Sequence, residues 1–389
     1  FNVVNVAHLT GPLGERGGGI PFSVLPLARQ LALAGHDVDV FGTDETDSDE
    51  AWQPARVRGF AIRGPEQFSY CPSMALALRS GSFDVVHSHG LWLHTSMIAT
   101  QWQARTSGRR VVSVHGMLNP SALRIGRWKK RVALQLYENR HLHTADCLHA
   151  LSEAERKAIR EFGVTGPVAV VPNGVTMLPE PTGEAIPAWQ SSVPENRKVL
   201  LYLGRLHPIK GLNELVDGWH AACVEVPGHD WTLVIAGWDD ADLLGSLRRK
   251  VADLGLGDRV IFVGPQFGDD KMASLRAADA FVLPSTSEGL PVAILEAWSC
   301  ALPVLMSRHC NLEEGFDGGA AIPADPTCSG VASGLTQLFA MPPAGLQEMG
   351  ARGRALVEQR FTWEAVAETM AAVYEWVSGS GRVPDCVDK

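Results

Sequence analysis

Short apolar runs alternate with stretches of helical periodicity along the whole chain. The runs lie at residues 2–7, 38–41, 84–87, 111–114, 168–171, 199–203, 233–236, 260–263, 280–283 and 303–306. Many are rich in β-branched residues, which is typical of buried strands. Strands that alternate with helices form parallel sheets with helices on both faces. The sequence therefore predicts an α/β protein built from doubly wound parallel sheets.

The length of the chain predicts two such sheets. At 389 residues it exceeds what a single hydrophobic core usually supports. Residues 178–198 are rich in proline and lack periodicity, so we expect a linker there. It would join domains at 1–177 and 199–362, followed by a C-terminal helix and tail at 363–389 that could pack back on the first domain. Ligands of such sheets bind beyond the carboxyl ends of the strands, which predicts a cleft between the domains.

The overall charge and the cysteines narrow the class of protein. A net charge of −9 would repel a polyphosphate backbone, so we expect no nucleic-acid partner. The seven cysteines include no Cys-x-x-Cys pair, which indicates neither a disulfide framework nor a zinc site. No apolar run is long enough to cross a bilayer, and the chain opens directly with a strand. We therefore expect a cytoplasmic protein without a signal peptide or a membrane span.

Two glutamates eight positions apart, Glu288 and Glu296, flank the start of a predicted helix. Pro291 suits the first helical turn, so Glu288 should lie in the preceding loop and Glu296 one to two turns inside the helix. The free N–H groups of such a helix start favour a phosphate, and the carboxylates on either side accept hydrogen bonds from hydroxyls. A simpler interpretation is that Glu288 caps the helix and Glu296 is solvated.

Two cations, Arg205 and Lys210, follow the first predicted strand of the second half. Arg205 offers a planar fork for phosphate oxygens and Lys210 a compact charge, so together they could neutralise a diphosphate. A solvated loop is the alternative. In the first half, glycines that include Gly18 and Gly19 follow the first strand, as in turns that approach phosphate, although a flexible turn explains them equally well. Their spacing is not Gly-x-Gly-x-x-Gly, which disfavours a nicotinamide-binding domain.

His87 and His89 lie one residue apart at the end of a predicted strand and should point to the same face. They could ligate a metal, but no third ligand follows at a recognisable spacing. We therefore favour a role in lining an acceptor cleft and predict no metal site. The acidic pairs at 239–240 and 269–270 lie in polar loops and are interpreted as solvated surface.

Taken together, these motifs resemble the large family of retaining, nucleotide-sugar-dependent glycosyltransferases with the GT-B fold, of the Glu-x7-Glu type (family 4, group 1). The resemblance is carried by Gly-Arg-x4-Lys-Gly at 204–211, Glu-x7-Glu at 288–296, Pro-Asn-Gly-Val at 172–175 and Ala-Gly at 236–237. The segments 115–120, 236–239 and 310–315 look like a bacterial subgroup associated with exopolysaccharide and surface-polysaccharide assembly. The family often has aspartate after Pro-Asn-Gly-Val, whereas Thr176 stands there in this chain.

The resemblance implies a GT-B architecture, with two doubly wound, Rossmann-like domains facing an interdomain cleft. It also implies a role for each matching residue at the donor. Glu296 would bind the ribose hydroxyls and Glu288 the hydroxyls of the donor sugar. The cations Arg205 and Lys210 would bind the diphosphate, and His115 would reach the donor sugar near its C6 hydroxyl.

Further residues would complete the two substrate sites. Backbone groups of the donor site would come from Gly18, Gly19, Gly289, Leu290 and Val292. Base recognition relies on backbone and apolar contacts around Val263 and Gly264. The acceptor cleft would be lined by His87, His89 and Asn119.

The activity that the resemblance implies is transfer of a hexosyl group from a UDP- or GDP-sugar, with retention, to a carbohydrate or lipid-linked saccharide acceptor in polysaccharide biosynthesis. The family uses cationic side chains in place of a metal, so we expect neither a metal nor a cofactor. Two alternatives stay open: a sugar-nucleotide epimerase or hydrolase on the same frame, and a nucleotide-sugar binding protein without catalytic activity.

The segment 124–134 concentrates five cations and Trp128 in an otherwise acidic protein. On a helix it would form a basic amphipathic patch that attracts anionic headgroups, as a lipid-linked acceptor would require. This pattern predicts peripheral contact with the inner face of the membrane. A solvated helix face with Trp128 packed locally is the alternative.

Overall fold

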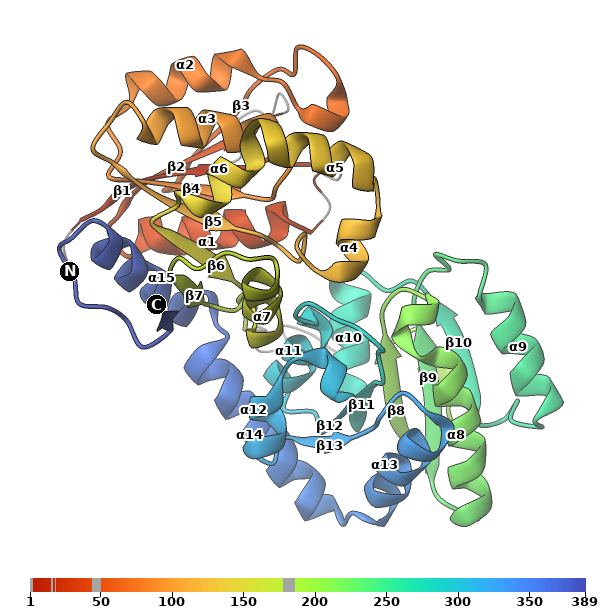
Figure 1. Ribbon diagram of the computed structural model, residues 1–389. Coiled ribbons are helices and arrows are strands. Elements are labelled where there is room, and N and C mark those ends of the chain that lie inside the picture. Colours follow the sequence, from red (N-terminus) through yellow and green to blue (C-terminus); the bar gives the residue numbers. More distant parts are fainter. Residues whose placement is uncertain (1–2, 15–16, 18, 44–49, 178–185) are drawn as a thin grey trace. The chain divides into compact units, whose positions relative to one another are not determined.

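The computed structural model describes residues 3–14, 17, 19–43, 50–177 and 186–389 (Figure 1). The chain divides into two compact units, one made of 1–174 with 363–389 and the other of 175–362. Each unit has a sheet of its own, and every strand pair recorded in these sheets is parallel except β14 with β7. The prediction of two doubly wound α/β domains is confirmed.

The first unit contains an eight-stranded sheet in the order β14-β7-β6-β5-β4-β1-β2-β3. Its strands are β1 Asn5–Leu9, β2 Asp37–Gly42, β3 Arg56–Gly59, β4 Val85–His89, β5 Arg109–Ser113, β6 Cys147–Ala150, β7 Val168–Val170 and β14 Val387–Asp388. Because successive side chains of a strand point to opposite faces, alternate residues enter two different cores. Val6 and Val85 pack into one core, whereas Ala7 and Val86 pack into another.

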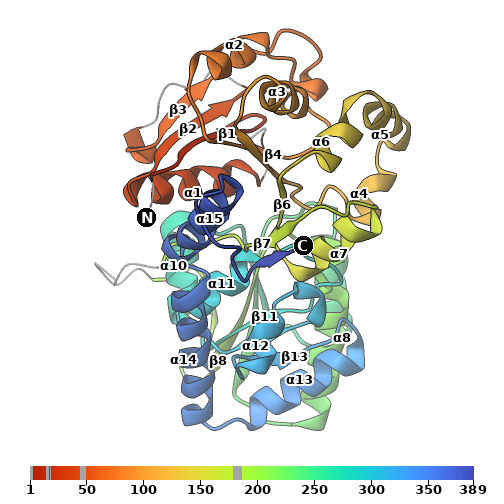
Figure 2. The ribbon, with the colours of Figure 1, turned by 60° about the vertical axis from the view of Figure 1, so that its left-hand side comes forward.

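Helices cover both faces of this sheet. They are α1 Pro21–Leu33, α2 Pro72–Ser80, α3 His94–Gln103, α4 Pro120–Arg124, α5 Arg127–Ala133, α6 Asn139–His143, α7 Glu153–Glu161 and α15 Trp363–Val377. The C-terminal helix α15 lies beside α1 in Figures 1 and 2, and the two share a core that includes Val24, Met370 and Val373. Helices α2 and α3 supply Met74 and Ile98 to the core on the opposite face.

The second unit contains a six-stranded sheet in the order β10-β9-β8-β11-β12-β13. Its strands are β8 Lys198–Leu203, β9 Trp231–Ala236, β10 Val260–Gly264, β11 Ala280–Leu283, β12 Val304–Met306 and β13 Ala321–Pro323. The helices are α8 Leu212–Glu225, α9 Leu244–Asp253, α10 Gly268–Ala277, α11 Val292–Ser299, α12 Glu313–Asp317, α13 Cys328–Ala340 and α14 Pro343–Arg360. One continuous core, which includes the buried Trp219, Trp231 and Trp298, joins them to the sheet.

All ten predicted apolar runs overlap strands of the structure, but four strands have no counterpart among them. Charged residues interrupt β3, and His149 interrupts β6. The other two, β13 and β14, are only three and two residues long. Short or polar strands carry too little periodicity to be recognised, and their neighbours in the sheet decide their conformation.

In both sheets the second and third strands are added one after another on one side of the first strand, and the next strands are added on its other side. This reversal lies between β1 and β4 in the first unit and between β8 and β11 in the second. At such a switch point the connections leave the sheet in opposite directions, and the carboxyl ends of two strands flank an open crevice. The topology therefore marks β1/β4 and β8/β11 as the places to look for ligand-binding side chains.

None of the described helices is both long enough and apolar enough to cross a membrane.

Gly211 closes the loop that follows β8 and lies close to the backbone of a neighbouring loop. Its φ is +68°, and a Cβ atom there would lie 2.1 Å from the carbonyl oxygen of Pro284 in the loop after β11. Gly255 has nearly the same φ, +67°, but nothing lies within 4 Å of its Cβ position. The two glycines therefore separate the cost of the backbone conformation from the cost of close contact.

We expect Gly255→Ala to lower the free energy of unfolding by about 1 to 2 kcal/mol, the cost of a left-handed alanine. Gly211→Ala should cost about 3 kcal/mol or more, because the new methyl group also pushes the two loops apart. Urea unfolding of the full chain, followed by tryptophan fluorescence, measures both. Equal losses in the two variants would show that the loops can separate freely.

Candidate active site

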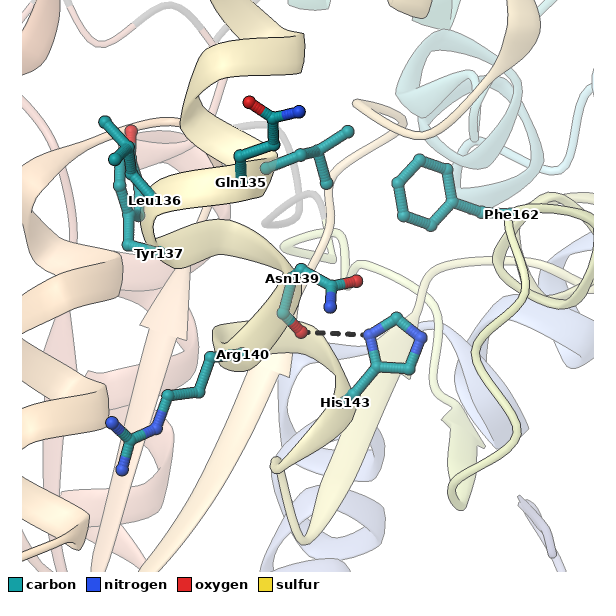
Figure 3. Close-up of a pocket in the computed structure, with 8 residues that line it drawn as sticks. Gln135, Leu136, Tyr137, Asn139, Arg140, His143 and Phe162 are labelled. Atoms are coloured by element: carbon teal, nitrogen blue, oxygen red, sulfur yellow. Dashed lines mark hydrogen bonds between the residues drawn. The ribbon is translucent and has the colours of Figure 1, made fainter.

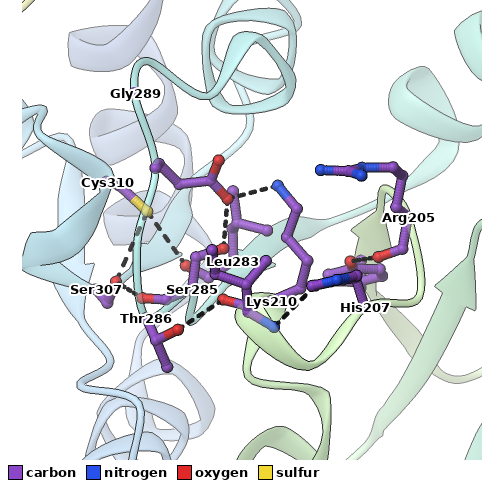
Figure 4. Close-up of polar contacts among 12 residues, drawn as sticks. Arg205, His207, Lys210, Leu283, Ser285, Thr286, Gly289, Ser307 and Cys310 are labelled. Carbon is purple, nitrogen blue, oxygen red and sulfur yellow. Dashed lines mark hydrogen bonds and ion pairs between the residues drawn. The ribbon is translucent and has the colours of Figure 1, made fainter. Parts of the chain in front are cut away.

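The switch point of the second unit brings the loops after β8 and β11 together (Figure 4). Residues 204–211 connect β8 to α8, and residues 284–291 connect β11 to α11. Backbone bonds tie the loops to each other, since Thr286 donates from its N–H to the carbonyl of Ile209 at 2.8 Å. The predicted cations lie in the first loop and Glu288 lies in the second.

Lys210 and Glu288 form an ion pair in which Nζ lies 2.6 Å from Oε1. Only 14% of the lysine side chain and 12% of the glutamate side chain are exposed, so solvent screens this pair weakly. The same carboxylate oxygen accepts a 2.5 Å bond from the hydroxyl of Ser285. Glu288 neither caps α11 nor is solvated, so the simpler interpretation of this residue is wrong.

The backbone of Glu288 is also fixed. Its N–H donates to the carbonyl of His309 at 3.0 Å, and its own carbonyl accepts from Nδ2 of Asn311 at 2.7 Å. The Asn311 amide also donates to the carbonyl of Gly289 at 3.2 Å. Ser285, His309 and Asn311 were missed by sequence reasoning. For His309 and Asn311 the reason is that no spacing relates the segment after β12 to the loop after β11.

Arg205 projects from the same loop as Lys210, and Figure 4 shows both side chains on the same side of that loop. Its Nη1 atom lies 2.8 Å from Oδ2 of Asp240, and its backbone carbonyl accepts from the Tyr202 hydroxyl at 2.6 Å. The guanidinium stays about half-exposed, so a ligand can reach it. Asp240 and the neighbouring Asp239 are exposed, as expected, but neither is merely solvated, since Asp239 accepts the N–H groups of residues 243 and 244.

Glu296 lies in the second turn of α11, at the predicted distance from Glu288. Its Oε1 atom pairs with Nζ of Lys271 on α10 at 2.6 Å, so it is not simply solvated either. Sequence reasoning missed Lys271, which follows two aspartates in a polar stretch that has no distinctive pattern. Helix α11 is thus associated with two of the carboxylate–ammonium pairs of the second unit, one with its carboxylate before the helix and one with its carboxylate inside it.

The start of α11 leaves backbone groups available to an anion. The helix begins at Val292, Pro291 occupies the cap position, and no side chain caps it. Gly289 and Val292 are exposed and Leu290 is half-buried. Val263 and Gly264 lie elsewhere, at the carboxyl end of β10, which is two strands away from β8.

The switch point of the first unit gathers histidines. His8 is the last residue but one of β1 and pairs in register with His87 on β4. His89 pairs with Ser113 on β5, and Ser113 pairs with His149 on β6. All five belong to the set of alternate residues that faces α1 and α15. The structure buries His87 and His89, with 0% and 2% exposed, so their side chains are not on the surface as residues lining a cleft would be.

One chain of hydrogen bonds runs across this cluster, and its polarity can be assigned. His149 Nε2 must donate to the carbonyl of Val171, at 2.7 Å, because a carbonyl only accepts. Its Nδ1 then accepts from the Ser113 hydroxyl, which accepts from His87 Nε2, both at 2.6 Å. The last bond, also 2.6 Å, comes from the Tyr374 hydroxyl to His87 Nδ1 and ties α15 to the sheet.

The cluster also has the geometry of a metal site. Ring nitrogens of His8, His87 and His89 lie within 4.8 Å of one another. Hydrogen bonds engage both nitrogens of His87, both of His89 and Nδ1 of His8, which leaves Nε2 of His8 without a partner. A metal would therefore have to displace existing bonds, and the residues fit a hydrogen-bonded network better than a ligand set.

His115 and Asn119 follow β5. Nε2 of His115 lies 3.1 Å from Nδ1 of His89. The next N–H, of Gly116, donates to the buried carboxylate of Glu155. Asn119 precedes α4 without capping it. Sequence reasoning missed Glu155, although Ser152 and Glu155 match the pattern of a helix capping box.

The remaining predicted position is the glycine loop after β1. Gly18 lies outside the described residues. Gly19 is placed two residues before α1, with open space at its Cβ position.

A separate surface pocket of about 530 Å³ is lined by residues of the helical segment 134–143 and by Phe162 (Figure 3). Among the lining residues, His143 and Asn139 are joined by a bond between Nδ1 of His143 and the carbonyl of Asn139, at 2.9 Å. None of the predicted site residues lines this pocket.

The buried histidines should make the stability of the chain depend on pH. Burial lowers the pKa of His8 to about 3 and that of His149 to about 4, whereas unfolded histidine titrates near pH 6.5. Between these values the unfolded chain binds more protons than the folded one. The free energy of unfolding therefore falls as the pH is lowered from 7 toward 4.

Each histidine that stays neutral in the folded protein should cost about 2 kcal/mol at pH 5 relative to pH 7.5. Urea unfolding at a series of pH values measures the slope, that is, how steeply the free energy of unfolding changes with pH. His149→Gln should make it shallower, because glutamine can keep both hydrogen bonds without titrating. His143→Gln, on the exposed surface, serves as the matched control and should leave the slope unchanged.

Family models match both units. Residues 18–174 match the glycosyl transferase 4-like domain, and residues 197–340 match the domain of glycosyl transferases group 1.

Two relatives that align with this chain over most of their length bear the same name. The chain is 31% identical to the D-inositol 3-phosphate glycosyltransferase of Kineococcus radiotolerans, over 94% of this chain and 93% of that protein. It is 29% identical to the protein of that name from Acidothermus cellulolyticus, over 96% and 89%.

Solved structures resemble the fold. Sucrose-phosphate synthase from Thermosynechococcus elongatus gives a TM-score of 0.71 at 22% identity, covering 97% of this chain and 100% of that one. Anabaena HepE in complex with UDP and glucose gives 0.69 at 18% identity, covering 96% and 100%. The two domain matches, in this order, and the full-length relative at 31% identity lead to one conclusion. The chain belongs to the glycosyltransferase family with a glycosyl transferase 4-like domain followed by a group 1 domain.

Proposed function

We propose that this glycosyltransferase moves a hexosyl group from a nucleoside diphosphate sugar to a saccharide or lipid-linked saccharide acceptor, with retention of the anomeric configuration. The observation that carries the proposal is the weakly screened pair of Lys210 and Glu288 beside Arg205, at the switch point of the second sheet. Cations there can bind a diphosphate, and a carboxylate next to them can bind the sugar attached to it.

Lys210 can bind Glu288 and the diphosphate at the same time. An ammonium has three N–H donors, and only one is needed to hold Oε1 of Glu288. The other two remain for oxygens of the diphosphate. As the bond to the sugar breaks, negative charge grows on the leaving phosphate, and fixed cations stabilise that charge more in the transition state than in the ground state. Arg205 adds a second, more exposed cation on the same side.

The two carboxylates have separate roles in this proposal. Glu288 keeps one oxygen on Lys210 and Ser285 and presents the other to hydroxyls of the donor sugar. Glu296 is held by Lys271 through Oε1, which leaves Oε2 for the ribose hydroxyls. Free N–H groups at the start of α11 lie between them and suit a phosphate. We propose that the leaving phosphate itself takes the proton of the acceptor hydroxyl, so that no metal or cofactor is needed.

Among possible donors, a UDP-sugar is the first to test. HepE, which shares the fold, has been solved with UDP and with UDP-glucose. For the acceptor, a saccharide or lipid-linked saccharide of polysaccharide biosynthesis follows from the sequence motifs. A second candidate acceptor is D-inositol 3-phosphate, because relatives at 31% and 29% identity are named D-inositol 3-phosphate glycosyltransferases.

Helix α5 and the π-helical turn that follows it at 134–138 support a location at a membrane surface. Trp128, Val132 and Leu136 follow one another at four-residue spacing, and the side chains of Trp128 and Leu136 are 70% and 76% exposed. Exposed cations flank this apolar stripe, among them Arg127 and Arg131. Exposed apolar and basic side chains on one continuous helical segment, 127–138, fit the interface of an anionic bilayer. We therefore propose peripheral binding to the inner face of the membrane.

The activity is tested by incubating the chain with UDP-glucose, GDP-mannose and saccharide acceptors in the presence of EDTA. Formation of an α-linked product from an α-linked donor supports the proposal. Sugar release or epimer formation without any acceptor would favour the hydrolase or epimerase alternative. Donor binding without any product would favour a binding protein.

Lys210→Ala should lower turnover about a hundredfold or more, because the growing charge on the leaving phosphate loses its closest cation. Lys250→Ala is the matched control, since Lys250 is also a partly buried, ion-paired lysine of the second unit, bonded to Asp217 on α8. Steady-state kinetics and thermal unfolding of both variants separate catalysis from stability. Near-normal turnover of Lys210→Ala would contradict this role.

Replacing Arg127 and Arg131 by glutamate should weaken binding to vesicles with anionic lipid by roughly 10- to 100-fold, since each cation near the surface contributes about 1 kcal/mol. Flotation assays with and without anionic lipid measure it. The matched control replaces the exposed Arg79 and Arg105 by glutamate, which changes the net charge equally. Equal loss in both variants would indicate general electrostatics, and no binding by the unaltered chain would remove the membrane proposal.

A further inference from the structure

His115 is held at two points within the first unit. Its backbone has a φ of +47°, a conformation that residues other than glycine seldom adopt. The adjacent N–H of Gly116 donates to Glu155, whose carboxylate also accepts from the N–H of Leu151. The ring is held separately by His89. Such a conformation persists only where surrounding contacts stabilise it, and it is concentrated at functional sites.

The contact with His89 is part of a row of three imidazoles. Nε2 of His115 lies 3.1 Å from Nδ1 of His89, and Nε2 of His89 lies 2.9 Å from Nδ1 of His8. Burial keeps the pKa of His8 and of His115 at about 3 and lowers that of His89 as well, so all three are neutral at pH 7. A neutral imidazole has one N–H and one lone pair. The three rings must therefore share one tautomer, either all Nδ1–H or all Nε2–H.

The buried end of the row decides between the two. Nε2 of His8 has no hydrogen-bond partner among the described residues. With Nε2–H rings the row would end in a buried donor without an acceptor, whereas with Nδ1–H rings it would end in an unused lone pair. Among buried backbone groups, donors without a partner are rarer than incompletely satisfied acceptors. The same preference at His8 selects the Nδ1–H form for all three rings.

We propose that His89 and His8 are positioning residues that hold His115 as its Nδ1–H tautomer, so that Nδ1 donates a hydrogen bond to an oxygen of the sugar donor. No residue in the described part of the chain bonds to this nitrogen. The inference rests on the proposed function for the identity of the accepting oxygen. The tautomer itself is a property of the protein without substrate.

Two-bond ¹⁵N–¹H correlation spectra of the full chain, labelled at histidine, identify the protonated nitrogen of each ring. The His115 signals are assigned from their loss in His115→Gln. We expect Nδ1–H at His115 in the unaltered chain. His89→Gln should keep it, because a glutamine amide can accept from His8 and donate to His115. In His89→Leu the partner is lost, and the Nε2–H form should appear.

His87→Gln is the matched control. His87 is buried in the same cluster, with its ring centroid 4.1 Å from that of His89, but it forms no hydrogen bond in this row. Its replacement should leave the tautomer of His115 unchanged. Turnover with UDP-glucose should fall about tenfold or more in His89→Leu, because a catalytic contact loses its orientation, and His89→Gln should recover most of it.

An Nε2–H ring at His115 in the unaltered chain would overturn the inference, and this spectrum decides even if leucine at position 89 prevents folding. An unchanged tautomer in a folded His89→Leu variant would overturn it too. Spectra that behave as expected in a chain that transfers no sugar would support the tautomer and count against the proposed function.

Discussion

Parallel strand pairing is the constraint on which the rest of this structure depends. A parallel pair cannot be joined by a tight turn, so consecutive parallel strands need a longer crossover connection, which in most cases here contains a helix. The carboxyl ends of the parallel strands then lie at one edge, and where the strand order reverses, two of them border a crevice. In the second unit these are β8 and β11, and their loops bring Lys210 to 2.6 Å from Glu288.

The contact between these loops also explains why charged residues tolerate partial burial there. A carboxylate and an ammonium that are both largely shielded from water are costly unless each has its partner. Ser285 satisfies Glu288 further, while Asn311 and His309 hold its backbone. This arrangement leaves polar atoms in place before any ligand arrives, which is what preorganised electrostatic stabilisation requires.

The first unit also buries polar side chains at its switch point, but these side chains are neutral. Its switch point collects imidazoles from β1 and β4, with Ser113 and His149 from the neighbouring strands, all facing α15. Burial removes the water that would stabilise a charged imidazolium and so keeps these rings uncharged, and hydrogen bonds fix their tautomers. Tyr374, far away in sequence, provides the last donor. A C-terminal helix thereby becomes part of the N-terminal unit.

The sequence by itself determined the class of fold, because alternating strand and helix periodicity is local, and it located the cations and glutamates at strand ends. It could not supply Lys271 for Glu296, Asp240 for Arg205 or Glu155 for Gly116, since these partners lie on other elements with no fixed spacing. Likewise, the alternation in β4 placed His87 and His89 on one face, but only the tertiary structure decided that both are buried and that Tyr374 of α15 bonds to His87. Periodicity depends on residues that are close in sequence. The hydrogen-bond or ion-pair partner of a side chain depends instead on which elements the sheet order brings together.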